Sequence, residues 1–429
     1  MNHLKICQIY AREILDSRGN PTVETVVRLS GGAIGRASAP SGASKGSAEA
    51  KELRDQDPKR YNGMGVQRAV EWICGPVAQA LCGRNASQMR QVDLLLQKLD
   101  GTPDKSHMGA NVTLTVSLAC AKAASTALGT PLCRFVGGCG PLCLPLPAMN
   151  VLNGGVHANN NLDIQEFLLL PLGAPSYSQA LRWCVEIYHT LGALLQSQGY
   201  STAVGDEGGF APNFVQEKVA LDYLLQAIEK AGYRPGIDVF LGMDAASSSW
   251  YQAGVYQLPK SGKRYTSQEM ISYWEELTRE YPIAYLEDGL GESDWGGWQQ
   301  LTQRLGDRVL LVGDDLFVTN PVRLSQGIRQ GCANAALIKP NQIGTLTETL
   351  EAVQTAAKGG YAWVFSHRSG ETNDSCIADL AVATGAKILK GGAPARGERV
   401  AKYNQLLRLE QMLGKGAPFA LGQGKTLLD

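Results

Sequence analysis

Six polar residues each close a short apolar run in the second half of the chain. The runs VFLGMD, IAYLE, VLLVGD, AALIK, WVFSH and KILK end at Asp244, Glu287, Asp314, Lys339, His367 and Lys390. Three carboxylates around one point repel one another unless a cation neutralises them, and hard oxygen ligands favour Mg²⁺ or Mn²⁺. The other three residues, together with Arg368, are positive or can become so. A face that is acidic on one side and basic on the other suits a metal-bound, phosphorylated carboxylic acid.

The spacing of these runs predicts how they are positioned. From Glu287 onward the run ends are 23 to 28 residues apart, which suits one strand, one helix and two loops in each repeat. Such repeats build a parallel sheet, and their number within about 280 residues favours a closed (β/α)8-type barrel. The carboxyl ends of barrel strands share one face, so the six residues are expected to converge. Any one of them alone would more readily be a solvent-exposed charge.

Three loops add further candidates. The segment LPLPAMNVLNGGVHANNNLDIQEFLLLPLG contains two candidate strands joined by a loop that bears His157, with Gln165 and Glu166 in the second strand. The segment AVGDEGGFAPN presents Glu207 among glycines, in a loop that can approach a ligand closely. In the first half of the chain PSGAS ends at Ser44. Taken alone, each of these segments is also typical of an ordinary turn or connection.

The chain is long enough for two domains. Strand-like alternation at Val23, Thr25 and Val27 precedes stretches with helical spacing at 66–81, 88–99 and 112–127. Gly75-Pro76 interrupts the first of these stretches, and Gly101 to Pro103 follows the second. We expect an α+β lid domain over residues 1–130, an extended glycine- and proline-rich linker over 131–146, and the barrel over 147–429.

Composition excludes several classes of partner. Lysine plus arginine (40) equals aspartate plus glutamate (40), so no net charge favours nucleic acid or an anionic membrane. No apolar stretch approaches the roughly 20 residues of a membrane span, and we expect a soluble, unexported, cytoplasmic protein. The ten cysteines are scattered and are expected to be free thiols, since a large chain needs no disulfides. Cys133, Cys139 and Cys143 cluster without the spacing of a zinc site.

The whole chain resembles enolases, most closely bacterial ones. The resemblance runs from DSRGNPTVE to AKYNQLLRLE, and in between it is carried by SGAS, NGGVHANNN, IQEF, GDEGG, MDAASS, LED, GDDLFVTNP, IKPNQIGTLTE, SHRSGET and ILKGGAPAR. It implies the enolase kind of barrel and a carbon-oxygen lyase. The implied reaction is the reversible dehydration of 2-phosphoglycerate to phosphoenolpyruvate in glycolysis and gluconeogenesis, in a homodimer or higher homo-oligomer.

The resemblance also implies roles for the residues. Ligands of a tightly held Mg²⁺ would be Asp244, Glu287 and Asp314, and Ser44 would serve a second Mg²⁺. Catalytic positions would be Lys339, the base at C2, Glu207, the acid that helps the C3 hydroxyl leave, Glu166 beside it, and His367. Substrate contacts would come from Gln165, His157, His367, Lys390, Arg368 and Ser369, the last two holding phosphate. A base paired with magnesium is the general pattern of enolase-superfamily sites: divalent metal would stabilise the aci-carboxylate formed when the C2 proton leaves.

Two pKa shifts are expected from this arrangement. Lys339 accepts a proton only when neutral, and nearby Mg²⁺ and Lys390 are expected to lower its pKa. Glu207 must be protonated to donate, and the neighbouring Glu166 carboxylate is expected to raise its pKa.

Alternatives remain at this point. Lys45 stands after SGAS where the family commonly has threonine, so we hypothesise that its ammonium pairs with phosphate or weakens the second Mg²⁺. Replacing Lys45 by threonine and titrating activity against Mg²⁺ tests this. A paralogue acting on a phosphonate analogue, like carboxyphosphonoenolpyruvate synthases, is one alternative; acid-sugar dehydratases and racemases are disfavoured by Arg368-Ser369 and SGAS. A noncatalytic scaffold or surface-receptor role could be additional.

Overall fold

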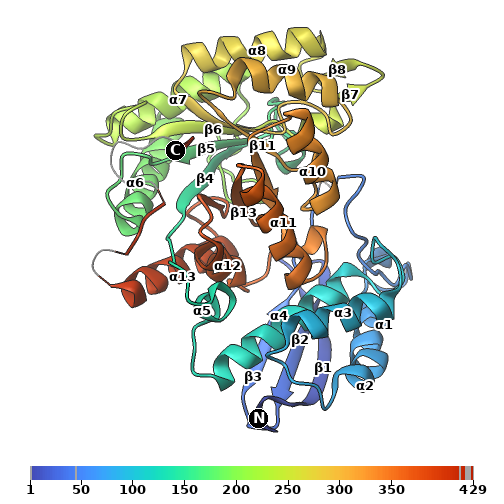
Figure 1. Ribbon diagram of the computed structural model, residues 1–429. Coiled ribbons are helices and arrows are strands. Elements are labelled where there is room, and N and C mark those ends of the chain that lie inside the picture. Colours follow the sequence, from blue (N-terminus) through green and yellow to red (C-terminus); the bar gives the residue numbers. More distant parts are fainter. Residues whose placement is uncertain (1, 44–45, 415–416, 421–426, 429) are drawn as a thin grey trace.

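The structure consists of an amino-terminal region of strands and helices and a barrel surrounded by helices (Figure 1). It is a computed structural model that describes residues 2–43, 46–414, 417–420 and 427–428. Ser44 and Lys45 lie outside the described residues, so their predicted roles remain predictions.

The amino-terminal region is an antiparallel sheet covered by helices, the α+β arrangement predicted from the sequence. Its strands, in the order β1-β2-β3, are β1 (Ile6–Leu15), β2 (Pro21–Leu29) and β3 (Ile34–Ser38). Its helices are α1 (Gln67–Trp72), α2 (Ala78–Leu81), α3 (Met89–Asp100) and α4 (Ala110–Ala127). Helix α4 packs on β2 and β3. There the buried hydroxyl of Thr25 donates to that of Thr115 at 2.7 Å, so neither polar group is left without a partner.

The interruption predicted at Gly75-Pro76 takes the form of a wider helical turn. A π-helical turn, Ile73–Val77, contains Pro76 and joins α1 to α2. Proline has no amide N–H and its ring crowds the carbonyl four residues earlier, so the wider turn accommodates it. Gly101 ends α3 in the left-handed conformation, with φ of 74°.

The segment 131–146 is not extended throughout, contrary to the prediction from its glycine and proline content. Helix α5 (Leu132–Gly137) occupies its first part and packs against α12 (Cys376–Thr384) of the barrel. Leu132 and Cys133 are buried in this contact, and tertiary burial stabilises a helix that is too short to form alone. Residues 138–145 contain turns, bends and an isolated bridge.

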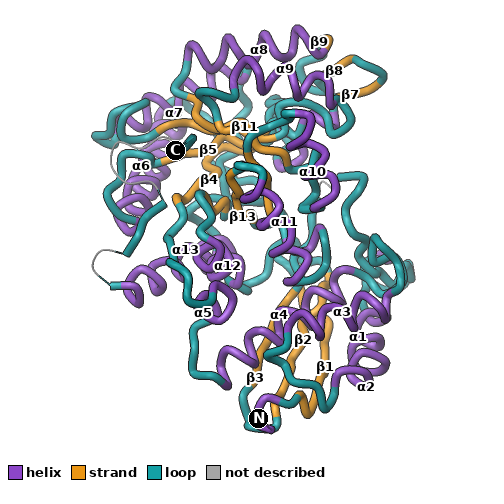
Figure 2. Tube along the Cα trace, viewed as in Figure 1, coloured by secondary structure: helices purple, strands orange, loops and turns teal. Residues whose placement is uncertain are grey.

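Eight strands close into a barrel, as the repeated apolar runs predict. They are β4 (Leu146–Asn153), β5 (Glu166–Leu170), β6 (Phe240–Asp244), β10 (Ile283–Glu287), β11 (Leu310–Gly313), β12 (Ala335–Ile338), β13 (Ala362–Ser366) and β14 (Ile388–Lys390). Their order around the barrel is β10-β11-β12-β13-β14-β4-β5-β6. Besides α12, the outer helices are α6 (Tyr177–Ser197), α7 (Glu217–Lys230), α8 (Ser267–Glu280), α9 (Trp295–Leu305), α10 (Pro321–Gln330), α11 (Leu346–Lys358) and α13 (Gly397–Leu413). Figure 2 shows the orange strands with purple helices around them. A small sheet of β7 (Tyr251–Gln252), β8 (Val255–Gln257) and β9 (Arg264–Thr266) precedes α8.

The strand β5 runs against its neighbours, so the expectation of a parallel sheet does not extend to it. It pairs antiparallel with both β4 and β6. The edge that carries the other strands' carboxyl ends therefore receives the first residue of β5, Glu166. In register Glu166 lies opposite Asp244 on one side and Asn153 on the other.

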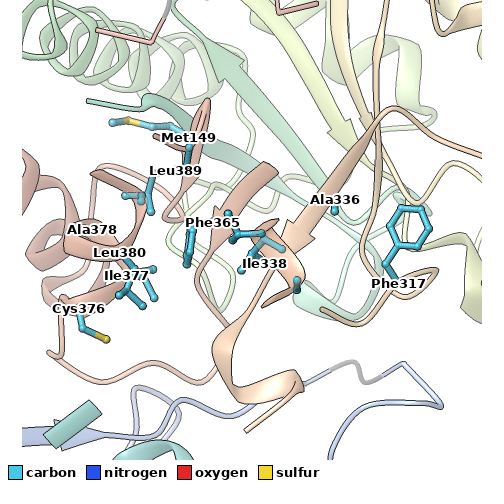
Figure 3. Close-up of a cluster of buried hydrophobic side chains, with 14 of the residues drawn as sticks. Met149, Phe317, Ala336, Ile338, Phe365, Cys376, Ile377, Ala378, Leu380 and Leu389 are labelled. Atoms are coloured by element: carbon cyan, nitrogen blue, oxygen red, sulfur yellow. The ribbon is translucent and has the colours of Figure 1, made fainter. Parts of the chain in front are cut away.

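Apolar side chains fill two layers of the barrel domain. Residues that point into the barrel include Leu168, Tyr285, Leu337, Val364 and Ile388. The alternate residues point outward, and Figure 3 shows Phe365 and Leu389 beside Ile377 and Leu380 of α12. Both layers hold the strand ends in fixed positions.

The amino-terminal region is attached to the loops at the carboxyl end of the barrel. Lys122 Nζ on α4 lies 2.6 Å from Asp374 Oδ1. Asp93 on α3 accepts the Thr347 amide N–H at 2.8 Å, at the start of α11, and Ser41 forms a bridge with Gly370. These contacts bring the loop that follows β3 over the barrel mouth.

All ten cysteines are free, as predicted. Within the described part of the chain, no helix combines the length and the apolarity that a membrane crossing requires.

Candidate active site

The predicted residues meet at the carboxyl end of the barrel. The last residues of β6, β10 and β14 are Asp244, Glu287 and Lys390, and the residues directly after β11, β12 and β13 are Asp314, Lys339 and His367. A narrow cavity with a volume of about 20 Å³ lies among them. Its lining includes His157, Gln165, Glu166, Glu207, Asp244, Lys339, His367, Arg368, Ser369 and Lys390.

Lys390 joins three carboxylates. Its Nζ lies 3.0 Å from Asp244 Oδ2, 2.9 Å from both oxygens of Glu287, and 3.2 Å from Glu166 Oε1. Burial alone would lower its pKa, but the three carboxylates outweigh burial and raise the pKa well above its ordinary value. Lys390 is therefore a buried cation that ties β14 to β5, β6 and β10.

Lys339 pairs with Asp314, and this contact determines the direction of its pKa shift. Its Nζ donates to Asp314 Oδ2 at 2.5 Å, while Gln342 donates to the other oxygen of Asp314 at 2.9 Å. Burial lowers the pKa of Lys339 and Lys390 lowers it further, but Asp314 more than compensates, so the pKa is raised. The expected lowering by Lys390 is present, but Asp314 outweighs it through a direct contact that the sequence did not indicate. The lowering expected from Mg²⁺ stays a prediction.

The predicted metal ligands suit a hard divalent cation by their chemistry. Burial, and then the charge of Asp244, raise the pKa of Glu287 to about 8. The positive charge of Lys390 therefore does not fully compensate these carboxylates, and a divalent cation with oxygen ligands is the kind of partner that would. Among the described residues, two sets place ligand atoms within 4.8 Å of one another: Asp288 with Asp314 and Asp315, and His157 with Glu166 and Glu207. Of the predicted metal ligands, Asp314 belongs to the first set.

Asp288 is a supporting residue that the sequence did not single out, although it follows the LE of the LED motif. Its carboxylate accepts the amide N–H groups of Asp314 and Asp315, both at 2.9 Å. It thereby fixes the backbone that carries Asp314. Its own φ is 43°, a left-handed value that is uncommon for aspartate.

The carboxylates Glu166 and Glu207 share a buried pocket with two histidines. His367 Nε2 lies 3.3 Å from Glu207 Oε2, and Asn150 donates to the same oxygen at 3.0 Å. His157 Nδ1 lies 3.6 Å from Glu207 and 3.8 Å from Glu166. His157 Nδ1 and Glu166 Oε2 are buried and have no hydrogen-bond partner among the described residues, as expected of atoms that await a ligand.

The pKa of Glu207 was expected to be raised, but in this structure it is lowered, and the pKa of Glu166 is raised instead. Burial, and then the charge of Glu207, raise the pKa of Glu166 well above its usual range. Burial acts in the same sense on Glu207, but His367, His157 and Arg399 outweigh it and hold the pKa of Glu207 well below its usual range. Of the two carboxyl groups, Glu166 is therefore the one that binds a proton more readily.

Arg368 and Ser369, the predicted phosphate ligands, face the loop that follows β3. The two terminal nitrogens of Arg368 donate to the two oxygens of Glu49, at 2.9 and 3.2 Å. Ser369 Oγ accepts the Ala43 amide N–H at 2.6 Å. Glu49 gave no signal in the sequence, since a carboxylate in a connecting loop is common. In the structure the Glu49 carboxylate occupies the position at which an anionic group binds Arg368.

Two family models match this chain. The model described as "Enolase, N-terminal domain" matches residues 6–136, and the model described as "Enolase, C-terminal TIM barrel domain" matches residues 141–427. Both matches agree with the two regions of the structure and point to a lyase of the enolase superfamily. The chain belongs to the enolase family.

Proposed function

We propose that this protein catalyses the reversible dehydration of 2-phosphoglycerate to phosphoenolpyruvate. The observation that carries the proposal is one cavity lined by a lysine, Lys339, a carboxylate pair, Glu166 and Glu207, and the adjacent Arg368 and Ser369. These groups correspond to a base, an acid and a phosphate site, the three functions that the reaction requires.

The base and the acid approach the cavity from different sides. Lys339 follows β12, whereas the loop of Glu207 is bridged through Phe210 to β4, three places further around the barrel. Lys339 would remove the proton at C2 and Glu207 would assist departure of the hydroxyl at C3. With the two groups on different sides of the cavity, each would act on its own carbon of the substrate.

The metal would be held by Asp244, Glu287 and Asp314. Mg²⁺ there would supply positive charge that stabilises the second negative charge left on the carboxylate when the C2 proton departs. Asp314 raises the pKa of Lys339 in this structure. Engagement of Asp314 by the metal would remove the partner that keeps Lys339 charged, and Lys339 would then be the better base. Ser44 is proposed as the ligand of a second Mg²⁺.

Substrate must compete with an existing ion pair. The cavity is narrow, and Glu49 occupies Arg368. The phosphate of the substrate would replace the Glu49 carboxylate on the planar guanidinium, which binds either group through two parallel hydrogen bonds.

The test is formation of phosphoenolpyruvate from 2-phosphoglycerate, followed by ultraviolet absorbance with Mg²⁺ and then with a chelator. Lys339→Ala and Glu207→Gln should each reduce kcat by about 10²- to 10⁴-fold, the usual contribution of an acid or base. Lys358→Ala, at the exposed end of α11, is the matched control. Absence of turnover in the unmodified protein with Mg²⁺, or full activity of Lys339→Ala, would refute the proposal.

We also propose a homodimer, supported by membership of the family. Light scattering on the purified protein tests this, and a monomer mass at micromolar concentration would contradict it.

A further inference from the structure

Arg399 is a fully buried arginine whose guanidinium lies at the edge of the site. It belongs to the first turn of α13 and is 0% exposed. Its Nη1 lies 2.7 Å from His367 Nδ1 and 2.5 Å from the Arg368 carbonyl oxygen. Its Nη2 lies 2.6 Å from the Ser369 carbonyl and 3.1 Å from the Asp206 carbonyl.

These contacts account for all the hydrogens on the two terminal nitrogens. Each terminal nitrogen of a guanidinium carries two N–H groups and accepts no hydrogen bond. Two acceptors therefore face Nη1 and two face Nη2. Because arginine remains protonated, the ring nitrogen it contacts must present a lone pair.

This requirement fixes the position of the proton on His367. With Nδ1 as an acceptor, a neutral ring carries its proton on Nε2, the nitrogen that lies 3.3 Å from Glu207 Oε2. His367 then donates to Glu207. Burial, with Arg399 acting in the same sense, lowers the pKa of His367 to about 4, which agrees with a neutral ring.

The backbone at Gly392 packs closely against this arrangement. Gly392 has a φ of 86°, and a Cβ built there would meet Arg399 Cδ at 2.8 Å, the Glu207 carbonyl oxygen at 3.0 Å and His367 Cε1 at 3.0 Å. Only glycine allows the arginine, the histidine and the Glu207 loop to approach so closely.

We infer that Arg399 is a positioning residue that holds His367 in the Nε2–H tautomer, so that His367 donates a hydrogen bond to Glu207. Through its carbonyl contacts it also aligns the backbones of Arg368, Ser369 and Asp206. The inference rests on the proposed function in one respect, namely that Glu207 acts on the substrate hydroxyl.

The first experiment needs no turnover. Protein labelled with ¹⁵N-histidine is studied free of substrate by long-range proton–nitrogen correlation, and the His367 signals are assigned from their absence in His367→Gln. We expect Nδ1 to be unprotonated and Nε2 to be protonated. A wild-type spectrum with the proton on Nδ1, or with a doubly protonated ring at neutral pH, overturns the inference even if no activity is ever found.

The second experiment compares variants. Arg399→Met should populate the Nδ1–H tautomer and reduce kcat by at least about 10-fold, as loss of an orienting partner typically does. Arg399→Lys, which keeps the charge and a donor, should keep the Nε2–H tautomer and restore part of kcat. Arg408→Met, an exposed arginine on the same helix, should change neither. An unchanged tautomer in a folded Arg399→Met overturns the inference.

Discussion

The buried pair of Lys402 and Glu371 allows the sharpest prediction about stability. Lys402, on α13, is 0% exposed, and its Nζ donates to Glu371 Oε2 and to the Thr372 carbonyl, both at 2.7 Å. Glu371 also accepts the amide N–H groups of Arg368 at 3.1 Å and Thr372 at 3.0 Å. Lys402→Met keeps the alkyl chain and removes the ammonium, which leaves a buried carboxylate with two neutral donors.

The cost follows from these contacts. Removing one partner of a buried ion pair destabilises a protein by about 3–5 kcal/mol. The two amide donors that remain keep the loss near the lower end, so we expect a decrease of about 3 kcal/mol in the free energy of unfolding. Urea titration followed by tryptophan fluorescence measures it, with Lys98→Met, exposed on α3, as the control.

A double-mutant cycle separates charge from packing. Glu371→Gln combined with Lys402→Met buries no charge, so its loss should be smaller than the sum of the single losses by at least about 1 kcal/mol. Additive losses, or a decrease below about 1 kcal/mol for Lys402→Met alone, would refute the reasoning.

Three further predictions concern single residues. His367 has a pKa of about 4 in the folded state against about 6.5 unfolded, so the unfolded chain binds more protons between these values and stability rises with pH there, by on the order of 3 kcal/mol. Urea titrations at pH 4 to 7 should show a smaller rise in His367→Gln; an identical rise would contradict the assignment. Trp298→Ala empties a fully buried position in α9 and should cost about 3–5 kcal/mol of unfolding free energy, whereas a loss under about 1 kcal/mol would mean that the site collapses freely. Gly392→Ala places a Cβ 2.8 Å from Arg399 at a φ of 86° and should lower both stability and kcat; an unperturbed variant would show that the backbone there adapts easily.

The sequence was most informative where strands end. The carboxyl ends of parallel barrel strands lie at the same edge. The proximity of Asp244, Glu287 and Lys390 could therefore be predicted from their positions in the repeat alone. The same logic located Lys339 and His367 next to them. The reversal of β5 changes none of this, because Glu166 begins that strand at the same edge.

Electrostatic detail could not be obtained in the same way. Whether Lys339 is charged depends on a contact of 2.5 Å with Asp314, and whether Glu207 or Glu166 carries a proton depends on which one faces His367 and Arg399. Such distances follow from side-chain packing of several elements. Glu49 reaches the site from a connecting loop, and Arg399 reaches it from the first turn of α13. The repeat pattern does not predict side-chain directions at such positions.

The hairpin of β4 and β5 offers one place at which the rim of the barrel can be altered by insertion. Its connecting segment, residues 154–165, departs from the barrel and re-enters it at the same rim, without crossing the outer layer of helices. Residues inserted there would extend over the mouth of the barrel without displacing an outer helix. The loop between β6 and α8 shows that connections after the parallel strands also accept added chain, since it contains the small sheet of β7, β8 and β9. Variants with new ligand preferences can therefore be sought in the hairpin tip as well as in those loops.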